Sequence, residues 1–142
     1  MSIRVASHQG VTAMTQTATI DFADLHARAH SAGHAAATKT TPRAIVVGEA
    51  KGLFSNEIDY SKPTFYESEG CCGFAWVSFP GNKPFGRWAK KAGLARSHYP
   101  SGLCIWVSDY GQSVERKSAY AEAYAKVLKD AGVDAYAGDR LD

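Results

Sequence analysis

Residues 102–142 read GLCIWVSDYGQSVERKSAYAEAYAKVLKDAGVDAYAGDRLD, and they carry the clearest structural pattern of the chain. An apolar run at residues 103–108 precedes a polar turn, a stretch without Gly or Pro at residues 113–131, and a second apolar run at residues 133–137. Ser113 suits a helix N-cap and Gly132 suits a helix stop. The stretch therefore predicts a strand, a helix and a parallel neighbouring strand, joined by a right-handed crossover.

In that topology the turn after residue 108, the start of the helix and the tail after residue 137 meet at one edge of the sheet. A second strand-to-helix turn, at residues 79–87, also combines Gly, a small polar residue and a basic pair. If the strands are parallel, the two turns lie side by side and form a basic cleft for an anion. The ligand-binding residues predicted for this cleft are Lys83, Arg87, Gln112, Ser113, Arg116, Lys117 and Arg140.

Arg116 is the central residue of this predicted site. It lies in the first turn of the helix, where the helix dipole disfavours a cation. Either a bound phosphate compensates for that cost, or Glu115 and Asp109 neutralise the charge. The basic side of the helix expected at residues 83–92 also has two interpretations. It contacts phosphate, or it only makes the protein soluble.

Upstream segments complete the predicted sheet. Residues 44–47, 64–67 and 72–79 are expected to be strands, with the last two forming a hairpin, while residues 48–62 and 95–101 are expected to be loops. Large and small side chains alternate in residues 72–79, which indicates that both faces of the sheet are covered or closely approached. Trp76 and Trp106 are accordingly expected in the core.

The predicted fold class is α/β, with α+β as the alternative. A flexible arm at residues 1–19 precedes a single domain at residues 20–142, made of an N-terminal helix at 20–39 and a core at 40–142. The core is expected to hold a mixed sheet of about five strands, with two C-terminal helices packed on it.

His26, His30 and His34 follow one another at four-residue steps on the N-terminal helix. Two such imidazoles can share a metal, but a straight helix cannot direct three of them at one ion, and no carboxylate or thiol completes the set. The row is interpreted as a solvated or partner-facing stripe. No metal site, cofactor or catalytic residue is predicted.

Composition limits the functional classes. With 142 residues, 45% hydrophobic content and a formal charge of +2, the chain suits one domain with a core, and nucleic-acid affinity would require local clustering of charge. The three cysteines are expected to be free thiols, with Cys72 and Cys104 in the core. No long apolar run or secretion signal is present, so a location in the cytoplasm without membrane contact is expected.

The motifs CGFAWV at residues 72–77, IWV at 105–107, QSVERK at 112–117 and AYAGDRLD at 135–142 together resemble a widespread set of small tailed-bacteriophage proteins. The likeness covers roughly residues 58–142, with a weaker echo around His34. It implies an accessory protein made in the bacterial host cytoplasm that interferes with host functions or defences. It implies no particular activity.

Three functions therefore remain open. The first is binding of a phosphorylated ligand, either a nucleotide or a nucleic acid, at the basic cleft. The second is inhibition of a host enzyme through a protein interface, and the third is an enzyme acting on a phosphoester. The chain lacks a Gly-rich phosphate fingerprint and a nucleophile elbow. Binding of a phosphorylated ligand is the leading prediction of the three.

Overall fold

The computed structural model describes residues 19–142. The N-terminal segment predicted to be flexible, residues 1–19, therefore lies outside the described residues except for its last position. Within residues 19–142, three helices and two antiparallel sheets form the fold, which confirms the predicted combination of helices and sheet. None of the described helices is long and apolar enough to cross a membrane. The elements are α1 (Phe22–Lys39), β1 (Ile45–Val47), β2 (Phe65–Glu67), β3 (Gly73–Phe79), α2 (Pro84–Lys91), β4 (Arg96–Ser97), β5 (Leu103–Trp106), α3 (Val114–Asp130) and β6 (Tyr136–Leu141).

The main sheet has the strand order β4-β5-β3-β6, and every neighbouring pair is antiparallel. Both β5 and β6 run opposite to β3, so they point the same way while β3 lies between them. The prediction that they are parallel neighbours is therefore wrong, although α3 does connect two strands of one sheet. From β3 to β6 the elements follow the split βαββαβ order.

Two further strand assignments differ from expectation. The predicted hairpin of residues 64–67 with 72–79 is wrong, because β2 pairs with β1 in a separate two-stranded sheet. In the main sheet, β4 occupies part of a predicted loop, and β6 begins at Tyr136 and continues through polar residues to Leu141. An edge strand has one unpaired side and mostly exposed side chains, so it lacks the apolar pattern of a buried strand.

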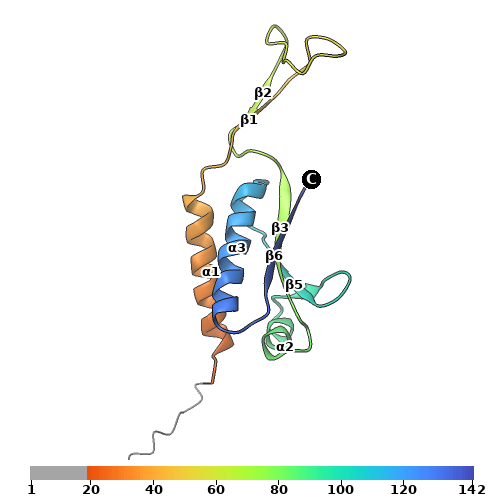
Figure 1. Ribbon diagram of the computed structural model, residues 1–142. Helices are drawn as coiled ribbons and strands as arrows, with labels where there is room; N and C mark the ends of the chain where they lie inside the picture. The colour runs from red at the N-terminus through yellow and green to blue at the C-terminus, as the bar shows by residue number, and fades with distance from the viewer. Residues whose placement is uncertain (1–18) are drawn as a thin grey trace, which may run out of the picture.

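The core lies between the inner face of the sheet and the two long helices. On β3 the buried residues alternate with half-buried ones, so Ala75, Val77 and Phe79 face inward. Helix α3 packs on β3 and β6, and α1 lies beside α3 on the same side of the sheet (Figure 1). Phe85 of α2 meets Phe79 at 5.0 Å between ring centroids, which places α2 on this inner side as well.

The histidine row of α1 faces a row of tyrosines. The Nδ1 atoms of His26, His30 and His34 lie 2.6, 2.6 and 2.8 Å from the hydroxyl oxygens of their partners, which are Tyr124, Tyr120 and Tyr110 respectively. The predicted solvated stripe is confirmed for His30 and His34, which are exposed, whereas His26 is half-buried. The prediction missed that these imidazoles also join α1 to α3 and to the loop before it. Burial raises the pKa of Tyr124, so its hydroxyl stays protonated. The tautomer of His26 decides whether that hydroxyl donates to Nδ1 or accepts from it.

Close approach of the two helices requires Gly33. A Cβ atom at this position would lie 2.6 Å from Cδ2 of Tyr120. The ring of Tyr120 is buried, and its hydroxyl is hydrogen bonded to His30. The ring therefore occupies the space that a side chain would need. The glycine that interrupts the helical pattern of α1 is a packing position.

Acid should weaken the contact between α1 and α3. Burial, together with the nearby His30, lowers the pKa of His26 below its ordinary value of 6.5. Above that pH the imidazole is neutral in both the folded and the unfolded chain. As the pH falls through 6.5, the unfolded chain gains a proton that the folded chain does not, so the free energy of unfolding decreases until the folded-state pKa is reached.

Urea unfolding at about pH 7.5 and about pH 5.5 measures this loss, and His26→Gln should reduce it. An equal pH dependence in the wild-type protein and the variant would contradict a role for His26.

Gly33→Ala should destabilise the protein although alanine favours helix formation. The helix gains about 1 kcal/mol from alanine, whereas overpacking against a fixed ring costs about 1–3 kcal/mol, so a net loss of about 1 kcal/mol is expected. Ser31→Ala, at an exposed position of the same helix, should stabilise slightly. Thermal unfolding of the two variants compares them, and a higher midpoint for Gly33→Ala would refute the packing role.

Candidate functional site: an aromatic face of the sheet

The antiparallel sheet separates the two turns that were expected to converge. Phe79, at the end of β3, pairs with Leu103, whereas the start of β3 lies beside the end of β6 and the start of α3. The turn at residues 79–87 and the turn at residues 108–117 therefore lie at opposite ends of the sheet. Lys83 and Arg87 occupy one end, and the other predicted residues, Gln112, Ser113, Arg116, Lys117 and Arg140, gather toward the other end.

Protein groups occupy the start of α3. The side chain of Ser113 is buried and accepts a hydrogen bond from the Arg116 amide at 3.4 Å, which confirms Ser113 as the N-cap. The amide of Val114 donates to the Cys71 carbonyl, and the carbonyl of Gln112 accepts from the Gly73 amide, both at 3.0 Å. These contacts bind the helix terminus to the entry of β3, and they use backbone donors that the sequence analysis assigned to an anion.

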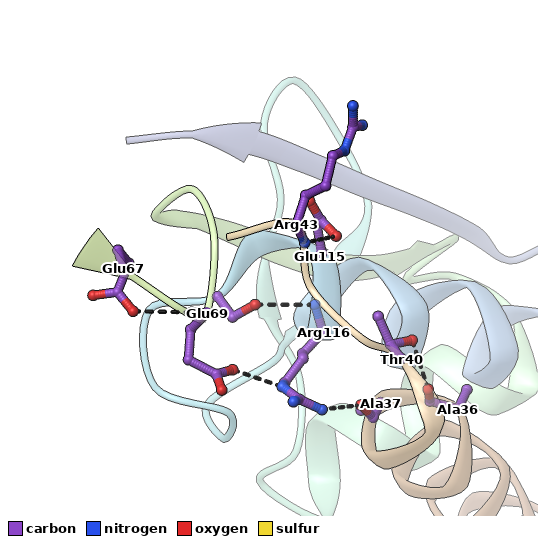
Figure 2. A network of polar contacts seen from close by, with 9 residues as sticks. Ala36, Ala37, Thr40, Arg43, Glu67, Glu69, Glu115 and Arg116 are labelled. Atoms are coloured by element: carbon purple, nitrogen blue, oxygen red, sulfur yellow. Dashed lines mark hydrogen bonds and ion pairs between the residues drawn. The ribbon is translucent and has the colours of Figure 1, made fainter. Parts of the chain in front are cut away.

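Arg116 connects three segments of the chain. Its Nε donates to the Glu69 carboxylate at 2.6 Å, and its Nη1 donates to the carbonyl of Ala37, in the last turn of α1, at 2.9 Å. Figure 2 shows the side chain reaching between these two partners, with Glu115 accepting from the Arg43 amide nearby. The groups that balance the charge of Arg116 are therefore Glu69 and the C-terminus of α1, and not Glu115 or Asp109.

Lys117 and Arg140 both lie near the Phe74 ring. The Lys117 ammonium is buried and donates to the Gly73 carbonyl at 3.3 Å, while it lies 5.7 Å from the centroid of the Phe74 ring. The Arg140 guanidinium lies 5.2 Å from the same centroid. Arg140 is exposed, so it is the cation of this pair that a ligand can contact.

The outer face of the sheet carries aromatic side chains and none of the described helices. Phe74 and Trp76 alternate with the inward-facing residues of β3, and Trp106 lies directly opposite Trp76 on β5. The centroids of the two indole rings are 5.3 Å apart, and that of Phe74 is 6.0 Å from that of Trp106. All three side chains are half-buried, so the prediction of core tryptophans is wrong.

A hollow of about 380 Å³ opens on this face. Tyr99, which is 90% exposed, lines it together with Arg140, and His98 packs against Trp76 at 6.0 Å between ring centroids. A larger groove of about 700 Å³ shares Ser97 and His98 with the hollow and extends toward α2, where it includes Lys90. The lining of the hollow is Trp76, Ser97, His98, Tyr99, Cys104, Trp106 and Arg140. We call these residues and Phe74 the aromatic face.

The chain around the aromatic face is basic. Residues 70–108 contain five lysines and arginines and no carboxylate, so this segment is far more basic than the chain as a whole. Arg96 of β4 lies opposite Cys104 of β5 and therefore on the outer side of the sheet. The remaining four are Lys83, Arg87, Lys90 and Lys91, all at or within α2.

The thiols give no sign of catalysis. Burial raises the pKa of Cys104, which keeps this thiol protonated and chemically inert. Its buried position matches the prediction, whereas Cys72 is exposed rather than in the core. Among residues 19–142 no group of three His, Cys, Asp or Glu side chains could hold a metal ion.

Comparisons with protein-family models, with curated proteins and with solved structures find no match to this chain. The chemistry of the site therefore has to be inferred from its own residues. The aromatic face combines flat apolar rings, an exposed guanidinium and a basic surround, which suits a planar ligand that carries negative charge.

Arg116→Ala should lower stability, because the substitution removes a charge-assisted hydrogen bond to Glu69 and a bond to the end of α1. A loss of about 1–2 kcal/mol is expected, since the side chain is only partly exposed. Arg87→Ala, at an exposed position of α2, should change stability little. Urea unfolding measures both variants, and equal midpoints would show that Arg116 does not hold these segments together.

Proposed function

We propose that this protein binds single-stranded nucleic acid by stacking bases on the aromatic face. The observation that carries the proposal is the placement of Phe74, Trp76 and Trp106 on adjacent central strands, on the side of the sheet that no described helix covers. Stacking on exposed rings is how many proteins bind unpaired bases. By analogy of fold alone, a four-stranded sheet with aromatic residues on its central strands also resembles the RNA-recognition arrangement.

The positive charge around the hollow favours a nucleotide over other ligands that bind to clusters of aromatic rings. A cluster of aromatic rings could also hold a quaternary ammonium group through cation–π attraction. Arg140 lines the hollow and already lies on the Phe74 ring, so it would repel a cationic ligand. The same guanidinium attracts a phosphate, and Arg96 of β4 adds positive charge on the same side of the sheet. Lys90 lines the larger groove together with Asp134.

The shape of the site favours an unpaired strand. Bases of a duplex stack on each other and are not available to protein rings, whereas unpaired bases can lie on a flat apolar surface. The hollow continues into the larger groove through Ser97 and His98, so a strand has a path from the aromatic face toward α2. A strand on that path would bring its phosphates near Lys83 and Arg87. These two residues were first predicted to bind an anion in a cleft between two turns. An accessory role in phage infection is compatible with such binding.

Removal of a ring or of the guanidinium should weaken binding. Tyr99→Ala is expected to lower affinity about ten- to a hundredfold, because base–aromatic stacking contributes about 1–3 kcal/mol per base. Arg140→Gln should lower affinity and reduce the slope of log K against log salt by about 1. Fluorescence anisotropy with a labelled single-stranded DNA or RNA of about ten nucleotides gives both quantities.

The matched control is Arg28→Gln, because Arg28 is an exposed arginine of α1, on the opposite side of the molecule from the aromatic face. This variant should bind like the wild-type protein. If the wild-type protein does not bind either oligonucleotide, or if Tyr99→Ala and Arg140→Gln bind as tightly as it does, the proposed site is refuted.

A further inference from the structure

Residues 44–69 form an arm that projects from the end of the helices and the main sheet (Figure 1). Its base is the pairing of β1 with β2, in which Val46 lies opposite Tyr66. Farther out, Ala50 and Ile58 form an isolated bridge, and the chain turns between them. The loop predicted at residues 48–62 is confirmed, since no named helix or strand lies there. Backbone hydrogen bonds from Lys51 to Glu57 and from Asp59 to Glu49 nevertheless join its two halves.

Large apolar side chains are concentrated on the arm. Leu53 and Phe54 at its tip are 97% and 102% exposed. Aromatic side chains bury about 150–250 Å² each, so the four exposed rings of the arm present roughly 600 Å². With Leu53 and the two valines the total approaches the ~800 Å² that each partner contributes to a standard protein interface. The exposed residues are Val46, Val47, Leu53, Phe54, Tyr60, Phe65 and Tyr66.

The strands of the arm also lack the usual protection against pairing. Among the described residues, β1 and β2 pair only with each other, so each has an outer edge that meets no other strand. Exposed edges usually carry lysine, proline or a bulge, but β1 reads Ile-Val-Val. A two-stranded ribbon is marginally stable alone, and a third or fourth strand stabilises it.

Both lysines of the arm are paired with carboxylates of the arm. Lys51 pairs with Glu57 at 2.8 Å, and Lys62 pairs with Glu49 at 2.6 Å. The two pairs neutralise four of the five charges at residues 49–62, which reduces the repulsion between two such tips. The arm contains more carboxylates than lysines and arginines, which makes it a poor surface for nucleic acid.

We propose that two copies of this chain form a dimer by pairing their arms. A second copy is the occupant that fits, because the exposed large apolar residues outside the arm are few and scattered over β6 and separate loops. The only described surface of the second copy that matches the arm in size and apolar character is therefore its own arm. Contact between identical surfaces gives a two-fold interface, which closes and limits assembly to two chains.

Sedimentation equilibrium of the full chain tests the proposal. The wild-type protein should have twice the 15.3 kDa mass of one chain at micromolar concentration. The double variant Phe54→Ser with Phe65→Ser should have the mass of one chain, and Val46→Lys, which places a charge on the β1 edge, should shift the dimer toward monomer at least tenfold in dissociation constant. Thermal unfolding verifies that the variants keep their fold.

Leu141→Ser is the matched control, because Leu141 is a 67% exposed apolar residue of β6, outside the arm. This variant should remain a dimer. Each subunit of the monomeric double variant should still bind single-stranded oligonucleotide, so this test is independent of the proposed function. A monomeric wild-type protein, including one that binds a different protein through its arm, would overturn the dimer, as would a double variant that remains dimeric.

Discussion

The contact between α1 and α3 is the interaction on which the rest of the structure depends. The two helices can approach closely because Gly33 leaves room for the Tyr120 ring. The three imidazole–hydroxyl pairs fix how α1 is aligned with α3 and with the loop before it. Phe22 at the start of α1 contacts Phe85 of α2, so the same helix also covers the part of the core next to α2. With all three helices on one side, the other side of the sheet is left for its aromatic side chains.

Local features of the fold could be predicted from the sequence. The three helices lie within one or two residues of their predicted bounds, because Asp21 and Ser113 cap two of them and glycine follows two of them closely. The pairing of strands could not be predicted, since it depends on contacts between segments far apart in the chain. The predicted anion cleft depended on this pairing, because the two basic turns could converge only if their strands were parallel neighbours.

Some of the missed features had a pattern in the sequence. Tyr120 and Tyr124 have the same four-residue spacing as the histidines of α1, so two matching rows on separate helices could have indicated their pairing. Phe74 and Trp76 on one side of a strand, with small or aliphatic residues on the other, fit an open aromatic face as well as a covered one. The partners of Arg116 had no such pattern, because one is a backbone carbonyl and the other is a glutamate 47 residues away.

The position of β3 has a consequence for how the aromatic face behaves. This strand is hydrogen bonded on both sides, to β5 and to β6, so its backbone has less freedom than that of any edge strand. Its amides should exchange with solvent among the slowest in the protein. Phe74 and Trp76 are thus fixed before any ligand arrives, and association with their rings loses little conformational entropy. A rigid surface of this kind favours ligands that adapt their own shape to it, as a flexible strand does.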